Sequence, residues 1–230
     1  MKTVIRAENL YKYYYIGRPE EVHALNDINL EIPENKSIVI HGPSGCGKTT
    51  LLCLISTIDR PTKGQVYLHD QDVSAFSDVE LSRIRRKTMG LVFQNFNLLL
   101  RLSAWENVAF PLIPVGISEK ERYNKACDLL VRLGLEKRIR HSPEEMSGGE
   151  QQRVAIARAL INNPDIIIAD EPTSNIDADS VQNLLNILDN LRRDGKTIII
   201  SSHDPIFNDY GDVTFHLVNG HLANVHKKEQ

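Results

Sequence analysis

Three short and nearly continuous apolar runs divide the chain. They are KSIVIHG (Lys36–Gly42), DIIIAD (Asp165–Asp170) and TIIISS (Thr197–Ser202), and each is rich in β-branched residues. Runs of this length and composition are typical of strands rather than helices. Because the runs lack polar alternation, we expect both faces of each strand to be covered, as in the parallel sheets of α/β proteins.

Helical patterns lie between these strands. The segment SEKERYNKACDLLVRLGL begins with Ser118 and Glu121 in the spacing of a capping box, and Gly134 near its end is a stop signal. Its apolar residues recur at helical spacing, at Tyr123, Ala126, Leu129, Leu130 and Leu133. The same Ser-x-x-Glu start occurs at Ser77/Glu80 and Ser103/Glu106. These signals predict several amphipathic helices with defined first turns.

The order of the signals predicts one α/β domain of 230 residues with a helical insertion. Residues 96–160 contain helix signals and no convincing strand, so we interpret them as an inserted α-helical subdomain. Residues 1–95 and 161–230 then form the α/β core. Within the core, VHALNDINLEIP (22–33) and GQVYLHD (64–70) indicate an antiparallel β subdomain packed on one side.

Charge and cysteine content narrow the possible partners and compartment. The chain has 27 Lys and Arg residues against 30 Asp and Glu residues, a net charge of −3, so there is no global basic field to hold nucleic acid. Its cysteines, Cys46, Cys53 and Cys127, form no metal-binding or disulfide spacing and indicate a reducing compartment. The N-terminus is not typical of a signal peptide, and no apolar run approaches the roughly 18 residues needed to span a bilayer.

A glycine-rich loop follows the first apolar strand. GPSGCGKT fits the pattern G-x-x-x-x-G-K-[ST] with Gly42, Gly47, Lys48 and Thr49, between a predicted strand and a predicted helix. Backbone N–H groups of such a loop face phosphate oxygens, and the following helix points its positive end at them. Lys48 is expected to reach the β- and γ-phosphates, and Thr49 to hold magnesium. The alternative is a glycine-rich turn without a ligand, which the matching spacing and context disfavour.

A phosphate-binding loop needs a metal partner and a means of activating water. IIIADEP supplies Asp170 at the end of an apolar strand and Glu171 directly after it. Asp170 is expected to bind Mg²⁺, and Glu171 to polarise the attacking water. The alternative is that these carboxylates only cap a turn.

A second glycine-containing helix start lies about a hundred residues after the loop. In MSGGEQQRVAIARAL, Ser147 and Glu150 have capping-box spacing, and the simplest interpretation is an ordinary helix start. A helix N-terminus is also an anion site. Since one nucleotide has one γ-phosphate, two such sites in one chain indicate that they serve different nucleotide molecules.

Together these motifs resemble those of ATP-binding-cassette (ABC) ATPases, the P-loop NTPases that power ABC transporters. The resemblance covers the whole chain. Its motifs, in the family's order, are the Walker A loop GPSGCGKT, the Q-loop LVFQNFNLL, the signature MSGGEQQRVAIARAL, the Walker B segment IIIADEPT, the D-loop SNID and the H-loop SSHD. It implies ATP and Mg²⁺ as ligands, a RecA-like core, and a head-to-tail homodimer in which one subunit's signature closes over the ATP of the other.

The resemblance also assigns roles to individual residues. Tyr14 aligns best with the aromatic residue that stacks on adenine, although Tyr11, Tyr13 and Tyr15 lie beside it. Gln94 would contact Mg²⁺ and the attacking water, and His203 would hydrogen-bond the γ-phosphate. The catalytic set is thus Glu171, His203, Lys48 and Gln94, and the metal set is Thr49, Gln94 and Asp170. The nucleotide-binding set is Tyr14, Gly42, Pro43, Ser44, Gly45, Cys46, Gly47, Lys48, Thr49 and Thr50, with Ser147, Gly148, Gly149, Gln151 and Asp177 acting across the dimer.

The family resemblance further implies an integral membrane permease as partner, and a cytoplasmic location at the inner face of the membrane. VFQNFNLL, SAWENVAFPL and EPTSNID look most similar to the branch with lipoprotein-releasing, macrolide-export and cell-division ATPases. The permease is expected beside the Q-loop, where a minority of the apolar residues of NFNLLLRLSAWENVAF face it. The alternative is a non-transport ABC ATPase that acts in mechanotransmission or assembly.

Overall fold

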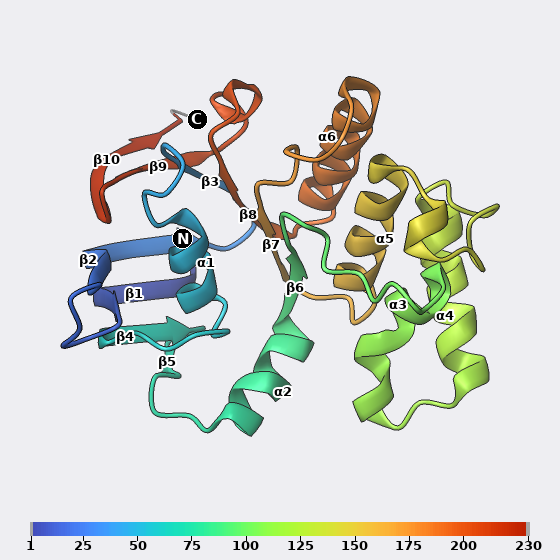
Figure 1. Cartoon of the computed structure of the whole chain (residues 1–230), viewed down its shortest axis with the longest axis horizontal. Helices are drawn as coiled ribbons and strands as arrows, with labels where there is room; N and C mark the ends of the chain where they lie inside the picture. The colour runs from blue at the N-terminus through green and yellow to red at the C-terminus, as the bar shows by residue number, and fades with distance from the viewer. Residues whose placement is uncertain (1, 229–230) are drawn as a thin grey trace.

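Two β-sheets form the frame of the molecule, with helices between and beside them (Figure 1). The computed structural model describes residues 2–228. In this part of the chain, the larger sheet has six strands in the order β10-β9-β3-β8-β7-β6, and all neighbours are parallel except β9 and β10. The strands are β3 (Ser37–His41), β6 (Met89–Val92), β7 (Ile166–Asp170), β8 (Thr197–Ser202), β9 (Val213–Val218) and β10 (His221–Lys227).

The central strands of this sheet are the three apolar runs of the sequence. β7 and β8 are buried along their whole length, and β3 is buried up to its last residue. Ile38 and Ile40 point into a core shared with the smaller sheet, whereas Val39 points to the opposite face. This alternation gives each strand two covered faces, which confirms the parallel α/β core expected from the sequence.

The smaller sheet is antiparallel, in the order β2-β1-β4-β5. Helix α1 lies between the two sheets, and its Leu51, Leu54 and Ile55 are buried with apolar residues of both. This packing places the start of α1 at the edge of the larger sheet where its parallel strands end. The elements are β1 (Thr3–Tyr14), β2 (Val22–Pro33), α1 (Lys48–Ile55), β4 (Lys63–Leu68) and β5 (Gln71–Asp72).

Residues 96–160 contain helices and no strand. These helices pack around a hydrophobic core of their own, in which Leu130 and Ala126 of α4 are fully buried. Helix α5 contributes residues to this core and also to the core between the larger sheet and α6. Within residues 2–228, no helix has the length and apolar character required to cross a membrane. The remaining helical elements are α2 (Asp78–Thr88), α3 (Ala104–Ala109), η1 (Phe110–Val115), α4 (Glu119–Arg132), η2 (Pro143–Glu145), α5 (Gly148–Leu160), α6 (Ala178–Arg193) and η3 (Pro205–Phe207).

The helix-capping contacts predicted from the sequence form in the structure, with one difference at α4. Full capping boxes form at Ser77/Glu80 and Ser103/Glu106, as the spacing predicts. Ser118 accepts a hydrogen bond from the Glu121 amide, but the Glu121 side chain pairs with Lys125 one turn further on, at 3.2 Å. Only half of the predicted box therefore forms at α4, because a lysine four residues along the helix competes for the carboxylate.

Adjacent residues of α4 provide a matched test of the helical core. We expect Leu130→Ala to lower the free energy of unfolding by about 2–5 kcal/mol, because Leu130 is fully buried and the substitution leaves a cavity. The control is Val131→Ala, at a side chain that is 53% exposed, with an expected change within about 0.5 kcal/mol. Urea unfolding measures both. Equal effects would show that α4 does not pack as described.

Candidate functional site

The loop between β3 and α1 surrounds the ammonium group of Lys48, the first residue of α1. Lys48 Nζ donates to the carbonyl oxygens of Gly42 and Pro43 at 2.8 and 3.1 Å, and the lysine is almost completely buried. Gly47, the residue before α1, has φ +107°, and a Cβ there would lie 2.7 Å from the Ala24 carbonyl oxygen. Only glycine suits both the backbone angle and the contact. The loop thus presents the start of α1 and one buried ammonium group to the same space.

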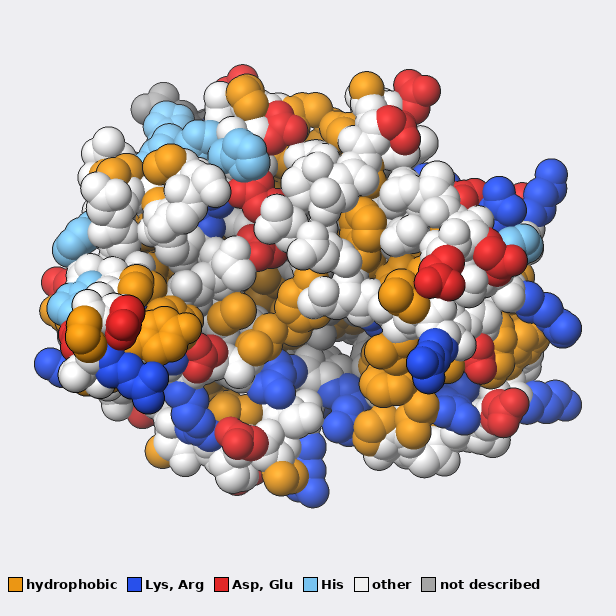
Figure 2. All heavy atoms as spheres, viewed as in Figure 1, with side chains coloured by type: hydrophobic (Ala, Val, Ile, Leu, Met, Phe, Trp, Pro, Cys, Tyr) orange, Lys and Arg blue, Asp and Glu red, His pale blue; other side chains and the backbone are white. Residues whose placement is uncertain are grey.

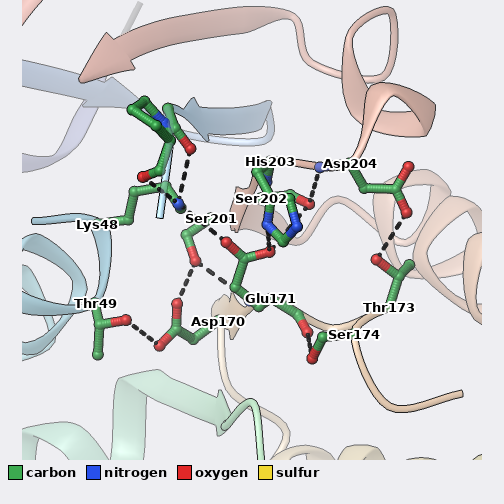
Figure 3. A network of polar contacts seen from close by, with 12 residues as sticks. Lys48, Thr49, Asp170, Glu171, Thr173, Ser174, Ser201, Ser202, His203 and Asp204 are labelled. Carbon is green, nitrogen blue, oxygen red and sulfur yellow. Dashed lines mark hydrogen bonds and ion pairs between the residues drawn. The ribbon is translucent and has the colours of Figure 1, made fainter. Parts of the chain in front are cut away.

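Thr49, the next residue, joins the loop to β7. Thr49 Oγ1 donates to Asp170 Oδ2 at 2.7 Å, and the buried Ser201 hydroxyl donates to Asp170 Oδ1 (Figure 3). These residues come from α1, β7 and β8, whose carboxyl or amino ends meet at one edge of the sheet. A carboxylate and a hydroxyl therefore stand side by side at the point that the sequence predicted for a metal.

Glu171 adopts a left-handed backbone conformation directly after β7, with φ +45°. Its N–H donates to the Ser201 carbonyl oxygen at 3.0 Å, and its carbonyl oxygen accepts a hydrogen bond from the Ser174 hydroxyl at 2.9 Å. A non-glycine residue in this region is uncommon and needs such support. The turn aims the Glu171 side chain back toward Lys48 rather than along the strand, as Figure 3 shows.

The Glu171 carboxylate is held between Lys48 and His203. Its Oε1 lies 3.1 Å from Lys48 Nζ, and its Oε2 lies 2.9 Å from His203 Nδ1. Burial by itself raises the pKa of Glu171, but hydrogen bonds from His203 and Lys48 and the charge of Lys48 together outweigh burial and hold the pKa below its usual range. Glu171 is therefore an ionised, mostly buried acceptor at neutral pH. His203 is 60% exposed and can be reached from solvent.

These groups lie along a cleft of about 570 Å³, and the hollow is visible in Figure 2. Lys48, Glu171, His203 and Gln94 line the same cleft as Tyr14. The volume lies within the range of small-ligand sites. The cleft is lined by Tyr14, Val22, His23, Ala24, Ser44, Gly45, Cys46, Gly47, Lys48, Thr49, Thr50, Gln94, Glu171, His203, Asn219 and Gly220.

Of the four neighbouring tyrosines, Tyr14 is the one that lines this cleft. Its hydroxyl lies 3.3 Å from Asp59 Oδ2, and burial raises the pKa of that hydroxyl. The Tyr13 ring is stacked on His23, with centroids 4.0 Å apart, and Tyr15 is 61% exposed. The structure therefore favours Tyr14 among the aromatic candidates left open by the sequence.

The predicted signature residues lie elsewhere. Ser147 caps α5, and Gln151 donates to the Pro143 and Met146 carbonyl oxygens at 3.0 and 3.2 Å. Gly148 lies close to Asn175, in the loop before α6, and Gly149 lies close to Ser180, in the first turn of α6, so a Cβ at either position would clash. Asp177 caps α6 through the Ser180 amide at 2.8 Å. The signature and the D-loop are thus packed together in one chain, and among residues 2–228 none of the predicted cross-dimer residues lines the cleft.

The other predicted residues take supporting positions. Gln94 is exposed on the cleft wall, and its carbonyl oxygen accepts a hydrogen bond from Asn175 at 2.8 Å. Gly42 and Pro43 contribute carbonyl oxygens to Lys48 rather than lining the cleft. Asp170 lines a neighbouring cavity of about 30 Å³ that shares Thr49 with the cleft.

Some parts of the cleft were not anticipated from the sequence. Val22, His23 and Ala24 enter from the start of β2, and Asn219 and Gly220 enter from the β9–β10 turn. The Gly220 N–H donates to the Cys46 carbonyl oxygen at 3.0 Å, which ties this turn to the phosphate loop. A turn signal at Asn219–Gly220 was readable, but its position beside a loop more than 170 residues earlier depends on the tertiary fold.

Comparison with known proteins supports the resemblance to ABC ATPases that the sequence motifs indicate. A family model described as ABC transporter matches residues 25–174, more than half of the chain. An ABC transporter ATP-binding protein of Thermotoga maritima is 40% identical over 99% of this chain and 97% of that protein. The macrolide export ATP-binding/permease protein MacB of Hyphomonas neptunium is 44% identical over 87% of this chain, which spans 31% of MacB.

A solved structure agrees over nearly the whole fold. It is the dimeric cassette MJ0796 of Methanocaldococcus jannaschii in a post-hydrolysis state bound to ADP and phosphate, with a TM-score of 0.91, 40% identity, and coverage of 98% of this chain and 99% of that chain. The chain therefore belongs to the ABC transporter family, as an ATP-binding cassette with the α/β P-loop NTPase fold and ATPase activity.

Two adjacent tyrosines test the base-binding end of the cleft. We expect Tyr14→Ala to weaken ATP binding at least about fivefold, because a base–aromatic stack contributes about 1–3 kcal/mol. Tyr13→Ala is the matched control and should change ATP affinity much less, because His23 covers the Tyr13 ring. Fluorescence titration with a labelled ATP analogue measures both. A larger effect at Tyr13 would contradict the assignment.

Proposed function

We propose that two copies of this chain close head to tail over two ATP molecules, and that hydrolysis then reopens the dimer and drives a membrane permease. The observation that carries this proposal is the separation of the signature from the cleft within one chain. The N-terminus of α5, with Ser147 exposed, is a potential anion site that faces no nucleotide cleft of its own subunit. A second subunit can supply the phosphate, and MJ0796 is a dimer.

The chemistry that we propose uses the three ends of the β3, β7 and β8 strands. ATP phosphates would enter between the loop amides and Lys48, where they would compete with Glu171 for the ammonium group, now 3.1 Å from Glu171 Oε1. Glu171 is ionised and can accept a proton from an attacking water. His203 holds the Glu171 carboxylate through Nδ1, which leaves its exposed Nε2 side free for the γ-phosphate.

Mg²⁺ fits the donor set beside this carboxylate. Thr49 and Asp170 offer hard oxygen atoms 2.7 Å apart, and Gln94 lines the cleft together with Thr49. In residues 2–228, no cluster of three or more His, Cys, Asp or Glu side chains is arranged to hold a metal. A small protein ligand set completed by substrate phosphate is what Mg²⁺ commonly uses. When bound, Mg²⁺ would neutralise phosphate charge, and Thr49 and Asp170 would hold it.

Mixing two inactive variants tests head-to-tail pairing. Lys48→Ala damages the phosphate loop but keeps the signature, and Ser147→Arg does the reverse. We expect each variant alone to be inactive, and the 1:1 mixture to recover partial ATPase activity, because one site of each mixed dimer combines an intact loop with an intact signature. A phosphate-release assay on the mixture measures this.

The control for this experiment mixes Lys48→Ala with Glu171→Gln. Both lesions lie on the loop side of the site, so neither site of the mixed dimer is intact and no activity should return. Recovery in the control, or none in the first mixture although both variants fold and Ser147→Arg binds ATP, would overturn the head-to-tail arrangement.

For the permease, we propose a groove of about 270 Å³ between α2, β6, η1 and α5. Phe110, at the start of η1, is 48% exposed on its rim, and Arg85, Arg86 and Arg158 lie along it. Exposed Ile113 and Val115 extend the apolar surface along η1. Such a surface with a basic border suits an apolar helix with an acidic or polar end.

This docking surface adjoins the Q-loop. Arg158 on α5 donates to the Phe96 and Asn97 carbonyl oxygens at 2.6 Å each, and so links the groove to the segment that follows Gln94. Of the apolar residues expected to face the partner, Phe96 is buried, whereas Leu99 and Leu100 are exposed. We propose that residues 96–160 act as the subdomain that passes movement at the permease to Gln94 and the signature. The subunit would then lie on the cytoplasmic face of the membrane.

Phe110→Glu tests the groove with the membrane protein encoded beside this chain. We expect the variant to lose at least about tenfold in co-purification with that protein, because a charge replaces a central apolar contact. Basal ATPase of the isolated cassette should stay unchanged. The control is Val225→Glu, at an equally exposed residue (50%) on β10 far from the groove. Equal co-purification of Phe110→Glu and wild type would contradict this docking surface, and a neighbouring protein without apolar spans would favour the non-transport alternative.

A further inference from the structure

Two histidines meet at the base of the phosphate loop. His41 is the last residue of β3, directly before Gly42, and its register partner on β9 is His216. Their ring centroids lie 5.6 Å apart at an angle of 69°. Since β3 and β9 are parallel neighbours, register partners point to the same face of the sheet.

His41 has unusual surroundings for a titratable ring. Its Nδ1 is buried and has no hydrogen-bond partner within residues 2–228. The titratable groups that face it are His216 on β9, Lys48 at the start of α1, Glu171 after β7 and His203 after β8. Burial, His216 and Lys48 lower the pKa of His41, and the opposing charge of Glu171 does not compensate. His41 is therefore neutral at neutral pH.

Nucleotide binding changes the charge around this ring. A triphosphate brings several negative charges to Lys48, one of the cations that keeps His41 neutral. Negative charge close to an imidazole favours the imidazolium form. Thermodynamic reciprocity then requires that protonation of the ring strengthens triphosphate binding by the same factor. The His41 Nδ1, which makes no hydrogen bond within residues 2–228, is the nitrogen that could take up the proton.

We propose that His41, packed against His216 at the end of β3, is a proton-binding site that takes up a proton when ATP enters the cleft and releases it when phosphate leaves. This inference depends on nucleotide binding in the cleft and not on the dimer or the permease. His41 does not line the cleft, so it acts as a positioning residue through charge and not as a catalytic residue.

The pH dependence of triphosphate affinity has a definite direction, because the free protein releases the proton at lower pH than the nucleotide complex does. Triphosphate affinity should therefore rise as pH falls through the pKa of His41 in the nucleotide complex, and the gain should be absent above that pKa. The gain is complete only below the pKa of His41 in the free protein, which burial holds below its usual range. A shift of one pKa unit limits the gain to about tenfold.

Calorimetry on the full chain measures directly how many protons the protein takes up when the nucleotide binds. Titration with a non-hydrolysable ATP analogue and Mg²⁺, in buffers of different ionisation enthalpy, gives the number of protons taken up at about pH 6.5. We expect wild type to take up more protons than His41→Gln, because protonation of the analogue is common to both proteins and cancels in the difference. The control His69→Gln, at an exposed residue in the β4–β5 turn, should match wild type.

A second measurement keeps the test independent of how His41→Gln folds. In wild-type protein labelled at its histidines, NMR titration should show the pKa of the half-buried His41 rising by about half a unit or more when the analogue binds. His216→Gln should raise the pKa of His41 in the free protein, because His216 is one of the groups that lower it. Equal proton uptake in wild type and His41→Gln, or a His41 signal whose titration the analogue leaves unchanged, would overturn the proposal.

Discussion

The convergence of parallel strand ends at one edge of the sheet is the constraint on which this molecule depends. β3, β7 and β8 are neighbours in register, so the residues that follow them meet although they are far apart in the sequence. Ser201 joins two of the strand ends by bonding the Asp170 carboxylate and accepting the Glu171 N–H. Because both sheet faces are covered by apolar residues, these polar groups are satisfied at the strand ends, beside the cleft that Glu171 lines.

Charge compensation organises the cleft itself. Lys48 and Glu171 are both buried, and each would be costly without the other. The same closeness makes the site responsive, since any anion that binds Lys48 alters the surroundings of Glu171, His203 and, further away, His41. Nucleotide binding, acid–base chemistry and the proposed proton uptake are therefore different consequences of one group of charges.

The signature helix shows why one chain provides only half of each proposed site. α5 starts with an exposed, capped N-terminus, yet its glycines press against the start of α6 and not against the phosphate loop. Its far end packs behind the sheet and holds the segment after Gln94 through Arg158. One rigid helix thus connects the surface where a second nucleotide would bind with the groove proposed for the permease.

The sequence by itself determined the fold class and the candidate residues of the site. Apolar runs without polar alternation predicted the buried parallel strands, and motif spacing predicted roles for Lys48, Thr49, Asp170, Glu171 and His203, because these features are local and have fixed spacing. Tertiary structure alone decided which tyrosine lines the cleft, that the Asn219–Gly220 turn and His23 complete it, and that His41 meets His216. Those results depend on strand register and on the packing of the two sheets across α1, and no local pattern encodes contacts between residues so distant along the chain.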